Sequence, residues 1–127
     1  MNVPEAETRR VLIVEDENAA REASKQYLQR QGYAVSVAAD AADAMRQVKA
    51  HPPNVVVCDW NLGEGPSGTD FARSLQTRFS VPVIFITAHP IDKLRREARD
   101  IDVVRFFRKP LRLAALARAI DAAASNA

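Results

Sequence analysis

Five side chains able to take part in chemistry stand at or close to the ends of apolar runs in the sequence: Glu15, Asp16, Asp59, Thr87 and Lys109. Three carboxylates brought together repel one another, so such a site needs a compensating cation, and hard oxygen ligands favour Mg²⁺. A carboxylate beside that ion can attack an activated phosphoryl group, because the metal neutralises charge on the transferring oxygens. A lysine can pair with one phosphate oxygen, and a threonine hydroxyl can donate to another. The set therefore predicts metal-assisted phosphoryl transfer to a carboxylate.

The segments between these side chains alternate between strand-like and helix-like patterns. Short apolar runs rich in β-branched residues predict five strands, at residues 11–14, 33–38, 54–58, 81–86 and 103–107. Apolar residues at helical spacing, with helix start and stop signals, predict five helices: 18–31, from 40 to the break at 51–53, around Phe71 and Leu75, 91–99, and through Leu113, Leu116, Ala117 and Ile120.

This alternation predicts an α/β fold with a single sheet. Strands as apolar as these are buried on both faces, which is typical of a parallel sheet between two layers of helices. Right-handed crossovers leave few topologies, and the doubly wound sheet is the natural one. Ligands of such sheets bind outside the carboxyl ends of the strands, so we expect the five side chains to converge on one pocket.

The composition indicates one water-soluble domain. The length of 127 residues suits a single domain, and we expect flexible ends at residues 1–8 and 124–127 around a domain at 9–123. No apolar run approaches the roughly 20 residues of a membrane span, and the first residues do not resemble a signal peptide. The single Cys58 lies within an apolar run, as expected of a buried thiol in a reducing compartment. We therefore expect a cytoplasmic protein without a membrane contact, and a net charge of +2 is too small to imply nucleic-acid binding.

Four pieces of the sequence carry a family resemblance: VLIVEDE at 11–17, VVVCDWNL at 55–62, IFITA at 84–88 and FFRKP at 106–110. With these pieces in this order, the chain resembles the receiver domain of bacterial two-component response regulators from about Val11 to Ile120. The resemblance implies a flavodoxin-like, CheY-like fold, a five-stranded parallel sheet of order 2-1-3-4-5 with five helices.

The resemblance also implies a role for each site residue. Asp59 is the phospho-acceptor, and Mg²⁺, for which Mn²⁺ can substitute, is bound by Asp16, by Glu15 directly or through water, by Asp59 and by the backbone carbonyl of Asn61. Lys109 pairs with the phosphoryl group and precedes a cis peptide bond to Pro110.

The remaining implied roles concern the response to phosphorylation. Thr87 is the switch hydroxyl, and Phe106 is the aromatic ring whose rotamer follows it. Asn61 and His89 flank the attacking water and tune hydrolysis of the phosphoryl group.

These roles imply a phosphorylation-dependent signalling switch rather than an enzyme that turns over a separate substrate. The phosphoryl donor is a phosphohistidine of a histidine kinase or of a histidine phosphotransfer protein. Residues 93–112 hold eight basic and three acidic side chains. A solvated charged face explains this excess, and so does an acidic downstream protein that docks on the fourth helix, fifth strand and fifth helix. We expect a monomer or a weak dimer that does not contact nucleic acid directly.

The sequence departs from the family pattern in three places. The loop at 61–68 lacks the usual proline and is enlarged, Asp100-Ile101-Asp102 replaces the usual Gly-Ala pair, and Phe106 replaces the commoner tyrosine. Two alternatives stay open: a degenerate receiver that acts as an interaction module without phosphorylation, and the receiver part of a hybrid histidine kinase.

Two other classes of protein fit the sequence less well. An aspartate-nucleophile phosphohydrolase has a second acid two residues after the nucleophile, where this chain has Asn61. A flavin or nucleotide binder needs a phosphate-binding glycine loop after the first strand. Here the acidic residues 15–17, followed by Asn18, would repel phosphate.

Overall fold

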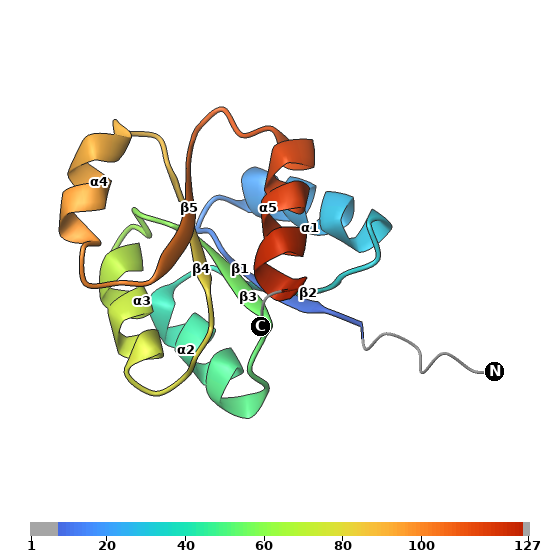
Figure 1. Ribbon diagram of the computed structural model, residues 1–127, viewed down its shortest axis with the longest axis horizontal. Helices are drawn as coiled ribbons and strands as arrows, with labels where there is room; N and C mark the ends of the chain where they lie inside the picture. Colours follow the sequence, from blue (N-terminus) through green and yellow to red (C-terminus); the bar gives the residue numbers. More distant parts are fainter. Residues whose placement is uncertain (1–7, 126–127) are drawn as a thin grey trace.

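A computed structural model describes residues 8–125, which form a parallel sheet of five strands covered by helices on both faces (Figure 1). The strand order is β2-β1-β3-β4-β5, which confirms the predicted order and the doubly wound fold. The strands are β1 Arg10–Val14, β2 Ala34–Ala38, β3 Val55–Asp59, β4 Val83–Thr87 and β5 Val103–Arg108. Because all five run in the same direction, their carboxyl ends lie at one edge of the sheet.

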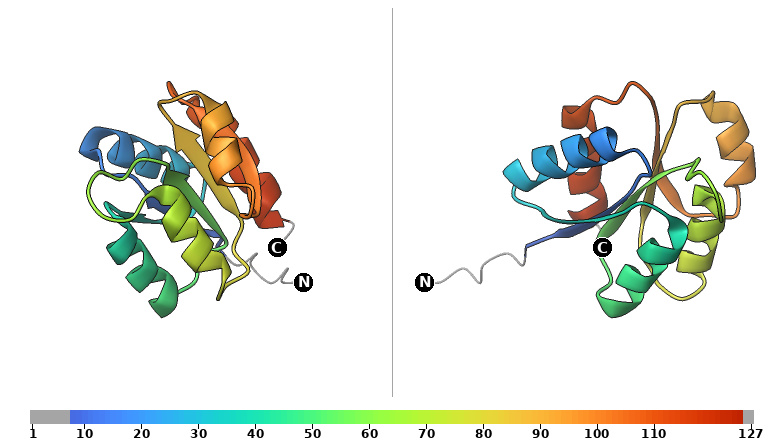
Figure 2. Two further views of the ribbon diagram at one scale, coloured as in Figure 1. Left: turned by 90° about the vertical axis from the view of Figure 1, so that its left-hand side faces the viewer. Right: turned by 180° about the vertical axis from the view of Figure 1, so that it is seen from behind.

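Five helices alternate with the strands, as predicted. They are α1 Asn18–Arg30, α2 Ala41–Ala50, α3 Gly68–Gln76, α4 Ile91–Glu97 and α5 Leu113–Ser125. Figure 2 shows α1 and α5 on one side of the sheet and the other three helices on the opposite side. Within residues 8–125, no helix is both long enough and apolar enough to cross a lipid bilayer.

Alternate residues of each inner strand build two separate cores. In β1, Leu12 and Val14 pack under α2, α3 and α4, whereas Val11 and Ile13 pack under α1 and α5. This follows from the two-residue side-chain period of a strand, which sends successive side chains to opposite faces. The buried thiol of Cys58 belongs to the first core, as the apolar run around it predicted.

The prediction that every strand is buried on both faces is correct for only three of the five. β1, β3 and β4 are almost wholly buried, whereas every residue of β5 and every residue of β2 except Ala38 is half-buried or exposed. These two are the outermost strands of the sheet, and the helix layers cover only part of each.

Two helix ends differ from the prediction by two residues, and α1 ends one residue early, at Arg30. α4 ends at Glu97 rather than at residue 99, because the chain turns at Ala98 so that Ile101 can be buried against the core. α5 continues through Ala124 and Ser125, although the sequence predicts a flexible tail from residue 124 onward. The predicted flexible ends otherwise lie outside the described residues, apart from Thr8.

An exposed ion pair joins α3 to the turn after α4. Arg73 donates to both carboxylate oxygens of Asp100, at 2.6 and 3.0 Å, and to the backbone carbonyl of Glu97 at 3.1 Å. The hydrogen bonds from Arg73 lower the pKa of Asp100 below its usual 3.8. Because the pKa of the Asp100 carboxyl is lower in the folded than in the unfolded chain, the ion pair stabilises the fold at pH values above the unfolded-state pKa. This contribution is lost as the pH falls through the folded-state pKa.

Substituting Arg73→Gln is therefore expected to raise the pKa of Asp100 back toward 3.8. An NMR titration of the side-chain carboxyl carbon of Asp100 measures this directly. Arg78→Gln is the matched control, since Arg78 makes no hydrogen bond to Asp100 in the described part of the chain. An unchanged titration of Asp100 in the Arg73 variant would contradict the ion pair.

Candidate functional site

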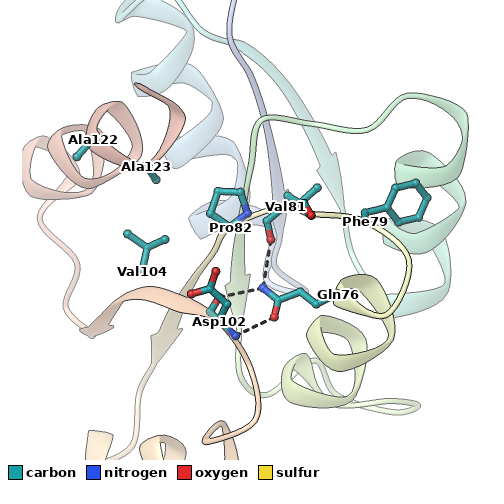
Figure 3. A pocket seen from close by; sticks show the side chains of 9 residues that line it. Gln76, Phe79, Val81, Pro82, Asp102, Val104, Ala122 and Ala123 are labelled. Carbon is teal, nitrogen blue, oxygen red and sulfur yellow. Dashed lines mark hydrogen bonds between the residues drawn. The ribbon is translucent and has the colours of Figure 1, made fainter. Parts of the chain in front are cut away.

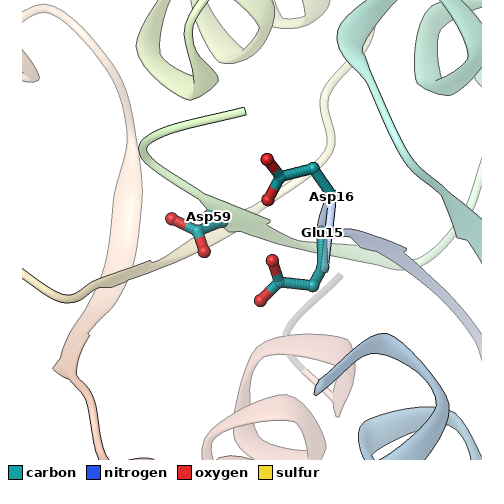
Figure 4. Close-up of side chains that lie close together, drawn as sticks. All are labelled: Glu15, Asp16 and Asp59. Carbon is teal, nitrogen blue, oxygen red and sulfur yellow. The ribbon is translucent and has the colours of Figure 1, made fainter. Parts of the chain in front are cut away.

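The three predicted carboxylates meet where β1 and β3 end side by side. Val14 is the register partner of Cys58, so the next residues along the two strands, Glu15 and Asp59, lie next to each other. Carboxylate oxygens of Glu15, Asp16 and Asp59 all lie within 4.8 Å of one another (Figure 4). Glu15 and Asp59 are each only 7% exposed, whereas Asp16 is open to solvent. The cluster is thus a shallow acidic site with one open side.

Lys109 supplies the cation that balances two of these carboxylates. Its Nζ atom donates to Asp59 Oδ2 at 2.7 Å and to Glu15 Oε1 at 3.1 Å. The residue is placed by the end of β5, where its backbone N–H donates to the carbonyl of Thr87 at 2.8 Å. The peptide bond from Lys109 to Pro110 is cis, as the resemblance implied.

The environment shifts the pKa values of the paired groups. Burial raises the pKa of Glu15, and the hydrogen bonds from Glu17 N–H and Lys109 offset only part of this effect. Burial alone lowers the pKa of Lys109, but its hydrogen bonds to Asp59 and Glu15 and their negative charges outweigh that effect and raise it. Lys109 therefore stays protonated at neutral pH.

Thr87 lies at the end of β4, one residue beyond Ile86, the register partner of Asp59. The threonine is fully buried, and its Oγ1 accepts a hydrogen bond from the backbone N–H of His89 at 2.9 Å. The side chain of His89 is exposed. On the other side, the backbone N–H of Asn61 donates to Asp59 Oδ1 at 3.1 Å. Each oxygen of the Asp59 carboxylate thus has a donor.

Phe106 lies on β5 further from the carboxylates and is half-buried. Its ring stacks near Phe85 with a centroid distance of 6.2 Å, and the guanidinium of Arg95 lies 4.9 Å from its centroid. The structure therefore brings Glu15, Asp16, Asp59 and Lys109 into one cluster, while Phe106 connects β5 to α4.

Two glycines of the 61–68 loop contribute to the site in a way that is not evident from the sequence. Gly63 has a φ of +73°, and a Cβ there would lie 3.2 Å from Asp16 Oδ2. Gly68 opens α3, and its N–H donates to the carbonyl of Trp60 at 2.8 Å. A Cβ at Gly68 would lie 2.2 Å from the carbonyl oxygen of Asp59. The glycine-rich composition of the loop was the available signal, but it does not reveal which backbone each glycine approaches.

Gly68→Ala is expected to lower the free energy of unfolding by roughly 1–3 kcal/mol, because the new methyl group overlaps backbone that cannot move freely. Urea denaturation measures this change. Gly65→Ala serves as the comparison: its Cβ would meet no atom within 4 Å, so only the positive φ is penalised, by about 1 kcal/mol. Equal stabilities of the Gly68→Ala variant and the unsubstituted chain would contradict the close approach.

The acidic cluster adjoins a small cavity of about 260 Å³ between α1 and the end of β5. Its walls include the small side chains of Ala20, Ala23 and Ser24, and both Asp59 and Lys109 reach it. A larger hollow of about 690 Å³ lies elsewhere, bordered by Gln76, Pro82, Val104 and Ala123 (Figure 3). Asp102 is its only carboxylate among the described residues, so this hollow lacks the groups for phosphoryl chemistry.

Comparison with known proteins agrees with this geometry. The protein-family model described as the response regulator receiver domain matches residues 11–121 of this chain. The transcriptional regulatory protein PdtaR of Mycobacterium tuberculosis is 31% identical over 119 residues, which are 93% of this chain and 58% of PdtaR. The sensory transduction protein RegX3 of Mycolicibacterium smegmatis is 37% identical over 86 residues, which are 66% of this chain and 37% of RegX3. The chain thus spans little more than half the length of PdtaR.

Two solved structures share the fold of this chain. The N-terminal domain of a response regulator/sensory box/GGDEF three-domain protein from Carboxydothermus hydrogenoformans superposes with a TM-score of 0.85 at 26% identity, covering 93% of this chain and 95% of that domain. FixJ-N gives a TM-score of 0.83 at 27% identity, covering 94% of this chain and 95% of that structure. The family match, the sheet order and the acidic cluster agree, and the chain belongs to the response regulator receiver domains of two-component signal transduction.

Proposed function

We propose that this chain is a phosphorylation switch in which Asp59 accepts a phosphoryl group from a phosphohistidine. The observation that carries the proposal is the Lys109 ammonium held between Asp59 and Glu15, at the edge of the sheet where all strands end. A cation already aimed at the acceptor carboxylate is placed to pair with the negative charge that a phosphoryl group brings.

The donor set also suits a divalent metal ion. Glu15, Asp16 and Asp59 offer carboxylate oxygens within 4.8 Å of one another, and these are ligands that Mg²⁺ prefers, with Mn²⁺ as a substitute. The exposed position of Asp16 leaves room for bound waters. We infer that these three residues and the backbone carbonyl of Asn61 hold the ion, whose chemistry is to neutralise charge on the phosphoryl oxygens.

The transfer forms one bond and breaks one. A carboxylate oxygen of Asp59 attacks the phosphorus atom while the P–N bond to the donor imidazole breaks, and the electron pair of that bond stays with the imidazole. Lys109 then pairs with a phosphoryl oxygen instead of with the free carboxylate. We infer that Asn61 and His89, which lie two residues beyond Asp59 and Thr87 in the sequence, control the approach of the water that later hydrolyses the acyl phosphate. The donor is a histidine kinase or a histidine phosphotransfer protein.

The output follows from a shift between two conformations. The Thr87 hydroxyl can donate a hydrogen bond to a phosphoryl oxygen, which changes its present contact with His89. Phe106 then repacks between β4 and α4. We infer that the basic face of α4, β5 and α5 presents this change to an acidic protein partner, and that the chain works as a monomer or weak dimer in the cytoplasm. The buried single thiol supports a reducing compartment.

The test is the intact mass of the protein after incubation with acetyl phosphate and Mg²⁺. The expected result is the gain of one phosphoryl group, lost with EDTA and restored with Mn²⁺. A chain that takes up no phosphoryl group and also binds no beryllofluoride, a phosphoryl mimic, would contradict the proposal. Binding of beryllofluoride without a stable adduct would indicate rapid hydrolysis and would support it.

A further inference from the structure

The residue after the acceptor, Trp60, ties the phosphorylation site to α4. Its indole N–H donates to Glu97 Oε2 at 2.7 Å, across 37 residues of sequence. The Trp60 backbone is fixed on both sides, since its N–H donates to the carbonyl of Ile86 and its carbonyl accepts from Gly68 N–H. The side chain is 8% exposed. Trp60 is therefore a rigid donor one peptide unit from Asp59.

α4 has few other attachments. It spans seven residues, and no side chain caps its N-terminus. Within the described part of the chain, Leu94 is its only buried residue, while Arg95 covers the ring of Phe106. At the C-terminal turn of the helix, Glu97 is held by Trp60 through its side chain and by Arg73 through its carbonyl. A helix with one buried side chain depends strongly on such polar contacts for its position.

Trp60 also touches the segment that responds to Thr87. The Trp60 and His89 rings meet edge to face, with centroids 6.2 Å apart, and the His89 backbone donates to Thr87 Oγ1. A hydroxyl that turns toward a phosphoryl group changes this backbone contact and with it the packing of His89 on Trp60. The indole thus lies between the switch hydroxyl and the last turn of α4.

From these contacts we propose that Trp60 and Glu97 form a latch, their hydrogen bond holding α4 in its unphosphorylated position. Breaking this hydrogen bond is then part of the free-energy cost of phosphorylating Asp59. Trp60 and Glu97 are therefore residues that position α4 for the switch. This inference rests on the proposed function for its effect on Asp59, but the hold on α4 itself does not depend on phosphorylation.

The first test compares Glu97→Ala, Trp60→Phe and the double variant in the full chain. Beryllofluoride affinity in the presence of Mg²⁺ is measured by titration calorimetry. Each single variant is expected to bind beryllofluoride roughly three- to tenfold tighter, because it removes one charge-assisted hydrogen bond from the unliganded state. The double variant is expected to bind it no tighter than the single variants, because both substitutions remove the same bond. Asp92→Asn removes one negative charge from the same helix without touching the indole bond, and it is expected to leave the affinity unchanged.

The second test needs neither metal nor phosphoryl mimic. Amide hydrogen exchange is expected to accelerate across 91–97 in Glu97→Ala while exchange across α5 stays unchanged. Unchanged exchange in α4, additive effects in the double variant, or equal beryllofluoride affinity of Glu97→Ala and the unsubstituted chain would each overturn the latch. If the unsubstituted chain binds no beryllofluoride, the proposed function fails while the exchange experiment still tests the latch.

Discussion

Asp59→Asn is expected to abolish metal-dependent phosphorylation of the chain. The amide has no carboxylate oxygen to attack phosphorus, and it removes one of the three negative charges that would hold Mg²⁺. Intact-mass measurement with acetyl phosphate and Mg²⁺ should show no adduct on the variant under conditions that label the unsubstituted chain.

The variant should keep its fold, so loss of labelling can be assigned to chemistry. Lys109 retains Glu15 as a partner at 3.1 Å, and an uncharged amide next to Glu15 relieves repulsion between two buried carboxylates. Glu64→Gln is the matched control, since it removes an exposed carboxylate from the same loop and outside the acidic cluster. Labelling of Asp59→Asn at the rate of this control would mean that another residue accepts the phosphoryl group.

Lys109→Met is expected to slow phosphorylation by about 10²-fold or more, the typical effect of removing one group that stabilises developing charge at a reaction centre. Methionine keeps much of the apolar stem of lysine and removes the ammonium. Arg108→Met is the control, because Arg108 is an exposed cation next to Lys109 in the sequence and forms no ion pair with Glu15 or Asp59 in the described structure. Equal rates in the two variants would show that Lys109 has no part in the transfer.

The same variant offers a second and opposite effect. Lys109 now occupies oxygens of Asp59 and Glu15 that would otherwise face a metal ion. Without the ammonium, the two carboxylates lack a counter-charge, so Mg²⁺ is expected to bind several-fold tighter, on the order of tenfold. The intrinsic fluorescence of Trp60, next to the site, can report metal binding in a titration. Weaker Mg²⁺ binding by Lys109→Met would contradict the view that lysine and metal compete for these oxygens.

Much of this protein could be predicted from its sequence, because the signals involved are local. Apolar runs rich in β-branched residues predicted the inner strands, and apolar residues at helical spacing predicted the helices between them. In a parallel sheet the carboxyl ends of all strands lie together. The residue types at these strand ends were therefore enough to predict that Glu15, Asp59 and Lys109 share one site. The cis peptide bond before Pro110 was predicted correctly through the family resemblance.

Other features were decided only by tertiary structure, because they join residues far apart in the chain. The ammonium of Lys109 meets Glu15 across 94 residues, and no local pattern specifies which carboxylate it contacts or at what distance. The need for glycine at Gly68 depends on how closely α3 approaches the carbonyl of Asp59. The hydrogen bond from Trp60 to Glu97 likewise exists only because the fold brings the end of α4 to the residue that follows β3. Periodicity and strand ends place residues on elements, whereas contacts between elements depend on the packing of helices against the sheet, which a local pattern does not contain.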